Sequence, residues 1–122
     1  MASKTVLVVD DNALNRKLLE GMLQIVQAEM LFAEDGTEGI RLAKEHHPDL
    51  ILMDVQLPDL DGFEVIAEIR KDPVLITIPY FYLTGNITAE RRQQADTDGC
   101  LGIVQKPIAV GEFIGTLKEV LA

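Results

Sequence analysis

The sequence predicts an α/β domain in which a parallel β-sheet carries helices on both faces. Short apolar runs alternate with longer segments of helical periodicity, five times along the chain. The runs are continuously apolar, as in strands that are covered on both faces. With 122 residues, of which 48% are hydrophobic, the chain has room for one ordinary domain and its core. We therefore expect a single domain over residues 1–122.

The five apolar runs define the strands of the predicted sheet. They lie at residues 5–9, 30–33, 50–53, 80–84 and 101–105. Strict alternation with helices makes the strands parallel, because each strand returns through a helical crossover. Within the fourth run, Tyr80, Phe81 and Tyr82 are interpreted as core and strand formers.

The first and last helical segments have broad apolar stripes, as expected of helices that pack on a sheet. The stripe of the first helix comprises Leu14, Leu18, Leu19, Met22, Leu23 and Val26. That of the last helix comprises Val110, Phe113, Ile114, Leu117, Val120 and Leu121. Both helices should therefore cover a face of the sheet.

The three middle helices have shorter apolar patterns. The second begins after Gly36. The inward residues of the second and third helices are expected to be Ile40, Ala43, Phe63, Ile66 and Ile69. The third should end near Asp72-Pro73, because a residue before proline is disfavoured in helical geometry. Residues 88–98 form a polar helix without a strong apolar stripe, and His46-His47 fall at the exposed end of the second helix.

Charge and composition argue against several functional classes. The formal net charge is −9 and the Lys and Arg residues are scattered, so the chain should repel nucleic acid. No apolar run approaches the roughly 18 residues that span a bilayer, and the N-terminus lacks the apolar segment of a signal peptide. Cys100, the one cysteine, excludes an internal disulfide and is interpreted as a buried small hydrophobe. We expect a cytoplasmic protein that binds neither membrane nor nucleic acid.

Four of the five predicted strands carry candidate functional side chains at their carboxyl ends, whereas the second strand leads to Glu34-Asp35-Gly36 and offers mainly a turn. The candidates are Asp10-Asp11-Asn12, Asp54, Thr84-Gly85 and Lys106-Pro107. In open parallel sheets, ligands bind beyond these ends, so the side chains should converge at one edge. The Lys106-Pro107 bond is also a candidate for a cis peptide.

The three acids of this edge favour a bound cation. A single aspartate after a buried strand could simply cap a loop, and Asn12 or Asp11 is expected to cap the first helix. Asp10, Asp11 and Asp54 together would repel one another, so a cation is the natural compensation. A few hard oxygen ligands with room for water and phosphate describe Mg²⁺ better than Zn²⁺ or a Ca²⁺ cage. The ammonium group of Lys106 and the hydroxyl of Thr84 would suit phosphate oxygens.

At these residues the sequence resembles the receiver domains of bacterial response regulators. The matching segments, VLVVDDN, PDLILMDVQLPDLDGFEV, LTG and QKP, span nearly the whole chain in the family's order and spacing. The resemblance implies a doubly wound five-stranded (βα)5 receiver fold of flavodoxin-like type, with strand order 2-1-3-4-5. Among receivers, stand-alone proteins of the cell-polarity and chemotaxis type are the most similar.

The resemblance also implies residue roles. Asp54 would be the phosphoacceptor, and Asp11, Asp10, Asp54 and the backbone carbonyl of Gln56 would hold Mg²⁺, with Mn²⁺ as a substitute. Thr84 and Lys106 would hold the phosphoryl oxygens. One position departs from the family pattern, because Ile103 stands where receivers usually carry a Tyr or Phe that acts as a switch.

The partners implied are a sensor histidine kinase or histidine phosphotransfer protein and a downstream protein target. We expect a monomer or weak dimer without an output domain or enzymatic activity on other substrates. The downstream surface should combine the fourth helix, fifth strand and fifth helix, including Arg91 and Arg92. A phosphorelay shuttle and the receiver fragment of a hybrid histidine kinase remain alternatives.

Two other classes share parts of this pattern. A phosphatase of the haloacid dehalogenase type also uses a strand-end aspartate, but it needs a second acid two residues later, where this chain has Gln56. A flavodoxin-like flavin carrier must accept a phosphate at its first loop, where Asp10 and Asp11 would repel it.

Overall fold

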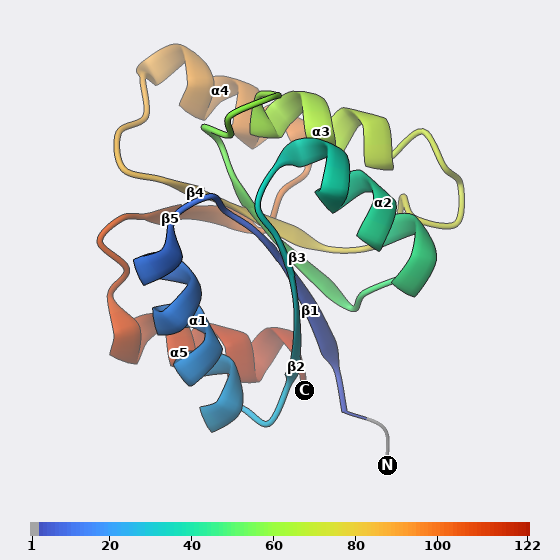
Figure 1. Ribbon diagram of the computed structural model, residues 1–122. Coiled ribbons are helices and arrows are strands. Elements are labelled where there is room, and N and C mark those ends of the chain that lie inside the picture. The colour runs from blue at the N-terminus through green and yellow to red at the C-terminus, as the bar shows by residue number, and fades with distance from the viewer. Residues whose placement is uncertain (1–2) are drawn as a thin grey trace.

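A computed structural model describes residues 3–122 and contains one five-stranded parallel sheet in the order β2-β1-β3-β4-β5 (Figure 1). The strands are β1 (Thr5–Val9), β2 (Glu29–Ala33), β3 (Leu50–Asp54), β4 (Tyr80–Thr84) and β5 (Gly102–Gln105). The helices are α1 (Ala13–Ile25), α2 (Gly36–His46), α3 (Gly62–Ile69), α4 (Ala89–Asp98) and α5 (Val110–Val120). The predicted fold class and strand order are confirmed.

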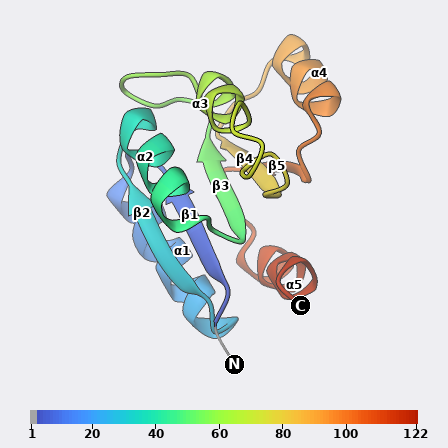
Figure 2. The same ribbon diagram turned by 90° about the vertical axis from the view of Figure 1, so that its right-hand side faces the viewer.

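The sheet separates two layers of helices. Helices α1 and α5 cover one face, and α2, α3 and α4 cover the other (Figures 1 and 2). Each face has its own apolar core, and alternate residues of a strand enter opposite cores. In β1, for example, Val6 and Val8 pack toward α1 and α5, whereas Leu7 and Val9 pack toward α2 and α3. This two-sided burial explains why the strands are continuously apolar.

Some predicted boundaries and inward positions were wrong. Leu14 is 78% exposed, because it lies in the first turn of α1, beyond the edge at which β1 ends. Helix α3 ends at Ile69, before the predicted Asp72-Pro73, and Leu101 is half exposed outside β5. Cys100 is only partly buried. Strand β3 is one residue longer than predicted and includes Asp54.

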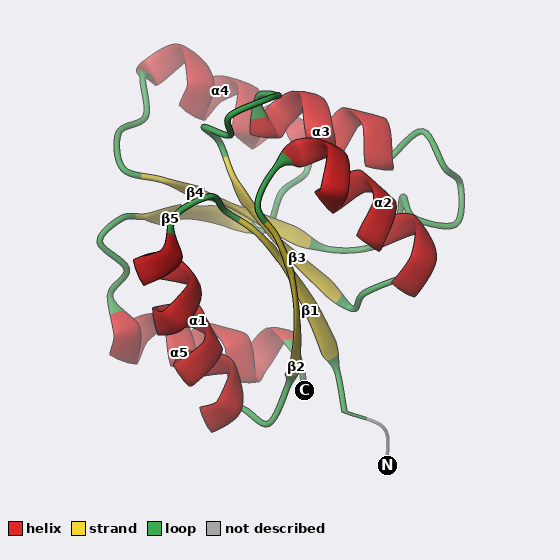
Figure 3. Ribbon diagram, in the orientation of Figure 1, coloured by secondary structure: helices red, strands yellow, loops and turns green. Residues whose placement is uncertain are grey.

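Figure 3 shows the loops that connect the helices and strands, of which the longest, residues 70–79, joins α3 to β4. The exposed position of His46 and His47 at the end of α2 agrees with the prediction. Within residues 3–122, no helix has the length and apolar character that a membrane span requires.

Candidate functional site

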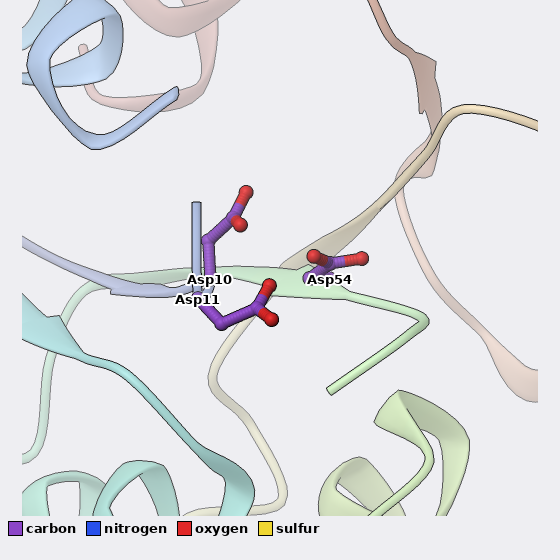
Figure 4. A group of neighbouring side chains, drawn as sticks. All are labelled: Asp10, Asp11 and Asp54. Atoms are coloured by element: carbon purple, nitrogen blue, oxygen red, sulfur yellow. The ribbon is translucent and has the colours of Figure 1, made fainter. Parts of the chain in front are cut away.

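The carboxyl ends of β1 and β3 bring three carboxylates together. Figure 4 shows Asp10 and Asp11 beside Asp54, which comes from the neighbouring strand. One carboxylate oxygen from each residue lies within 4.8 Å of those of the other two. Three acids predicted from separate segments of the sequence therefore form one cluster of hard oxygen atoms.

Asp54 is the last residue of β3 and is only 4% exposed. Its Oδ1 atom accepts a hydrogen bond from the backbone N–H of Gln56 at 3.0 Å, and its Oδ2 atom lies 3.0 Å from Nζ of Lys106. Burial raises the pKa of Asp54 to about 6, although the Gln56 N–H and Lys106 lower it and the charge of Asp10 raises it further. The carboxylate is thus poorly solvated, and its pKa lies above the usual range of an aspartate.

Asp10 and Asp11 lie in different environments. Asp10 is fully buried, and its oxygens accept hydrogen bonds from the Asn12 N–H at 2.9 Å and the Asn15 side-chain amide at 3.4 Å. The Nζ atom of Lys106 lies 3.2 Å from Asp10. Asp11 is exposed, and within the described part of the chain its carboxylate makes no hydrogen bond or ion pair. Asp11 therefore has oxygen atoms available for a ligand.

The predicted helix cap lies directly beside this cluster. The Oδ1 atom of Asn12 accepts hydrogen bonds from the N–H groups of Leu14 and Asn15, at 2.9 and 3.1 Å. Because Asn12 supplies the cap, neither Asp10 nor Asp11 is needed for it.

Lys106 follows β5 and reaches the cluster from the opposite side. Its side chain is 18% exposed and contacts both Asp10 and Asp54. Burial disfavours the ammonium charge, but the hydrogen bond to Asp54 and the two acidic charges outweigh it and raise the pKa of Lys106. The Lys106–Pro107 peptide bond is cis, as the sequence allowed.

Thr84 is at the carboxyl end of β4 but its hydroxyl contacts the following loop. The Oγ1 atom donates to the backbone carbonyl of Asn86 at 3.1 Å and accepts from the Asn86 N–H at 3.3 Å. The side chain is almost fully buried. Thr84 is therefore adjacent to the cluster and linked to the β4–α4 loop.

A cleft of about 410 Å³ opens over the acids. It is lined by Asp11, Asn12, Asp54, Gln56, Leu57, Pro58, Gly85 and Lys106. Asp10 and Thr84, which are both buried, are not part of this lining. The cleft thus exposes Asp11, one edge of Asp54 and Lys106 to an incoming ligand.

Two supporting residues, Asp59 and Gly62, lie in residues 57–62, a segment whose sequence indicates a turn and the entry to a helix but no contact with the site. Asp59 accepts hydrogen bonds from the N–H groups of Gly36 and Thr37, and so holds the start of α2. The backbone of Gly62 lies against β3, and a Cβ atom there would lie 2.2 Å from the carbonyl oxygen of Asp54. The glycine directly after the α3 cap, Asp61, was the available signal for this close approach.

Three comparisons with known proteins agree with this geometry. The sequence model of the response regulator receiver domain matches residues 6–118. The polar-differentiation response regulator DivK of Brucella ovis is 39% identical over 119 residues, covering 98% of this chain and 97% of that protein.

Two solved structures have the same fold with 98% of this chain covered. The chemotaxis protein CheY4 of Vibrio cholerae has a TM-score of 0.89 and 31% identity, and is covered completely. The receiver domain of a sensor histidine kinase from Pseudomonas aeruginosa has a TM-score of 0.87 and 30% identity, with 98% of it covered. That structure is described as having a magnesium ion coordinated in its active-site cleft.

Proposed function

Because the chain belongs to the response regulator receiver domain family, we propose that Asp54 is its phosphoacceptor in two-component or phosphorelay signalling. The observation that carries this proposal is the environment of Asp54. Its carboxylate is buried, which raises its pKa, and is held at one oxygen by Gln56 and at the other by Lys106. A poorly solvated carboxylate fixed at the edge of an open cleft suits a nucleophile.

In the proposed reaction, a carboxylate oxygen of Asp54 attacks the phosphorus atom of a phosphohistidine or a small phosphodonor. The new O–P bond forms as the bond from phosphorus to the leaving nitrogen or oxygen breaks. Lys106, which is already beside Oδ2, would follow the phosphoryl oxygens as a fixed positive charge. Thr84 would hold another phosphoryl oxygen after its hydroxyl turns away from Asn86.

The donor set fits Mg²⁺, with Mn²⁺ as a substitute. Asp10, Asp11 and Asp54 offer converging hard oxygens, and the backbone carbonyl of Gln56 would complete the protein ligands. A bound divalent cation would neutralise charge on the phosphoryl group during transfer. Asp11 is proposed as the principal ligand because its oxygens are available, whereas Asp10 is already hydrogen-bonded within the protein.

We propose that residues 1–122 act as a single cytoplasmic receiver domain that has no enzymatic activity on other substrates. Receivers of this kind interact with histidine kinases and downstream targets. The partners proposed here are a sensor histidine kinase or histidine phosphotransfer protein and a downstream protein, bound to a monomer or weak dimer. A shuttle in a phosphorelay or a receiver module of a hybrid kinase is a second candidate, favoured by the similarity to a kinase receiver domain.

Intact-mass spectrometry after incubation with Mg²⁺ and acetyl phosphate tests the proposal. We expect the protein to gain one phosphoryl group and Asp54→Asn to gain none. Asp96→Asn, an exposed substitution on α4, is the matched control and should behave like the original protein. Equal incorporation into Asp54→Asn would show that the acceptor is another residue.

A further inference from the structure

Helix α4 is attached differently from the other helices. It lies beside α3 on one face of the sheet (Figures 1 and 2). Ala95 is the only buried residue between Ala89 and Asp98, so α4 has almost no apolar face with which to pack. A helix of this composition must be held mainly by polar contacts, and these contacts lie at two separate points.

The first point of attachment is Asp98, the last residue of α4. Its carboxylate accepts a hydrogen bond from the hydroxyl of Tyr82 and lies 3.5 Å from Nη1 of Arg70. Its backbone carbonyl accepts hydrogen bonds from Arg70 at 2.6 Å and from the Tyr80 hydroxyl at 2.9 Å. Gly99 then ends the helix with a positive φ of 94°. The end of α4 is thereby fixed to α3 and β4.

This attachment is costly to break because Tyr82 is fully buried. Its ring packs on Phe63 with ring centroids 4.4 Å apart, so the ring has little freedom to follow a moving helix. If Asp98 moved away, the Tyr82 hydroxyl would remain in the core without a partner, and an unpaired buried hydroxyl is unfavourable. The Asp98 end of α4 should therefore stay in place while other parts move.

The second point of attachment is weaker and is exposed to solvent. Arg91, in the first turns of α4, forms an ion pair with Asp61, and the side chains are 39% and 21% exposed. The guanidinium also lies 5.1 Å from the ring centroid of Phe63. Exposed ion pairs contribute little because water competes for both charges. The Arg91 end of α4 can therefore be released more easily than the Asp98 end.

The Arg91 end is also the end nearer the candidate phosphorylation site. Asp61 pairs with Gln56 across the loop that begins directly after Asp54. From the other side, Thr84 bonds Asn86 in the loop that enters α4. A phosphoryl group on Asp54 could therefore affect this end of the helix through two short sets of contacts, one through Gln56 and Asp61 and one through Thr84 and Asn86.

We propose, on the basis of the proposed function, that α4 rotates about Asp98, which we call the pivot. The Arg91–Asp61 ion pair, which we call the catch, must break before the helix can rotate. Phosphorylation of Asp54 draws Thr84 from Asn86 and shifts the Gln56–Asp61 loop, and the first half of α4 swings away from α3. Tyr82 stays bonded to Asp98 throughout.

This arrangement accounts for Ile103, which stands in the usual aromatic position. Tyr82 is paired with Ile103 across the sheet, and its ring is already fixed by Phe63 and Asp98. The movable element is therefore the helix, and a rotating side chain at position 103 is not needed.

Hydrogen exchange of the full unphosphorylated chain, measured by mass spectrometry, tests the pivot. In Tyr82→Phe, amides of residues 95–101 should exchange about fivefold faster, as expected from losing a hydrogen bond worth about 1 kcal/mol. Tyr80→Phe is the matched control and should show a smaller effect, because Arg70 still bonds the Asp98 carbonyl. Unchanged exchange at residues 95–101 in Tyr82→Phe would overturn the pivot.

Hydrogen exchange at the amides of β1 shows whether a variant is destabilised throughout the domain. If Tyr82→Phe accelerates exchange there too, Asp98→Asn provides the second test, since it weakens the acceptor of the Tyr82 bond without emptying core volume. Faster exchange at residues 95–101, with β1 unchanged, supports the pivot in that variant. Exchange equal to that of the original protein overturns it.

The catch is tested by Arg91→Gln against Arg92→Gln, its neighbour on α4. Without phosphodonor, Arg91→Gln should accelerate exchange at residues 87–92 but not at 95–101, and Arg92→Gln should change neither. After incubation with acetyl phosphate and Mg²⁺, the original protein should show the same exchange pattern as unphosphorylated Arg91→Gln. Equal exchange in the two arginine variants overturns the catch, and equal acceleration along the whole phosphorylated helix overturns the pivot.

Intact mass, recorded on the same samples, separates this inference from the proposed function. If no phosphoryl group is incorporated, the proposed function fails and the release step fails with it. Hydrogen exchange of the unphosphorylated variants still tests whether α4 is held at Asp98 and at Arg91. If the group is incorporated and residues 87–92 do not respond, the release step alone is wrong.

Discussion

The Nζ atom of Lys106 lies 3.0 Å from Oδ2 of Asp54, although 52 positions of sequence separate the two residues. The same ammonium is 3.2 Å from Asp10, so one positive charge neutralises two largely buried acids. In the unphosphorylated protein, Lys106 is therefore a structural counter-ion. Its proposed role beside a phosphoryl group would use a charge that is already in place.

Lys106→Met should destabilise the metal-free protein by about 3 kcal/mol, because removing one partner leaves buried carboxylates uncompensated. Mg²⁺ should recover part of this loss by supplying positive charge to the same acids. Urea unfolding with and without Mg²⁺ measures both effects. Lys118→Met, an exposed substitution on α5, is the control and should change stability little.

Combining Lys106→Met with Asp54→Asn should restore part of the lost stability, since the second change removes one of the uncompensated charges. Strictly additive losses in this double-mutant cycle would contradict the pairing of Lys106 with Asp54.

Asp54→Asn should make the metal-free protein as stable as the original, or more stable, at neutral pH. The folded protein raises the pKa of Asp54 from 3.8 to about 6, so the folded state binds its proton more tightly than the unfolded state. The favourable contribution of the protonated group is present below about pH 4 and is lost as pH rises through 6. The advantage of the asparagine variant should therefore grow between pH 4 and 6, as urea unfolding across that range would reveal. A constant difference would argue against the raised pKa.

Asp11→Ala should weaken Mg²⁺ binding more than Asp10→Ala does. Asp11 has available oxygens, whereas the two oxygens of Asp10 are bonded to Asn12, Asn15 and Lys106. We expect at least about tenfold weaker binding in Asp11→Ala, since even residues that support metal ligands often contribute that much. Asp10→Ala should instead lower the free energy of unfolding. Calorimetric titration with Mg²⁺ and urea unfolding separate the two roles, and equal, negligible losses of affinity would exclude both acids as ligands.

Asp59→Asn should destabilise the fold by about 1 kcal/mol at neutral pH, an estimate that allows for solvent screening of this exposed residue. The Gly36 N–H, followed by the contacts of Thr37, lowers the pKa of Asp59 from 3.8 to about 2. This stabilisation is present above about pH 4 and disappears as pH falls through 2. The difference between variant and original in urea unfolding should therefore shrink as pH is lowered from 4 toward 2.

The elements that build the site could be predicted from sequence because strand ends obey a topological rule. In a parallel sheet of order 2-1-3-4-5, which the family resemblance implied, the carboxyl ends of β1 and β3 must be neighbours. The positions of Asp10, Asp11 and Asp54 follow from this rule without knowledge of any side-chain angle. Their convergence within 4.8 Å agrees with it.

Contacts between distant segments were not predictable in the same way. Asp59 caps a helix that begins 23 residues earlier, and no local pattern indicates which helix a turn residue will contact. Tyr82 was interpreted only as a core residue, although its hydroxyl bonds Asp98. The exposed position of Leu14 depends on where the sheet ends beneath α1, which helical periodicity alone does not indicate.

Gly62 has a consequence for the tolerance of this chain to mutation. Its backbone N–H bonds the carbonyl of Val55, and the space a methyl group would need is filled by the backbone of Asp54. Even the smallest replacement must push aside the peptide of Asp54, the proposed nucleophile. Misplacement of a reacting group by about 1 Å can cost about a hundredfold in rate. In a saturation mutagenesis screen scored by phosphorylation, position 62 should therefore be as intolerant as Asp54. Gly62, which has no functional group, would then be scored together with the residues of the proposed active site.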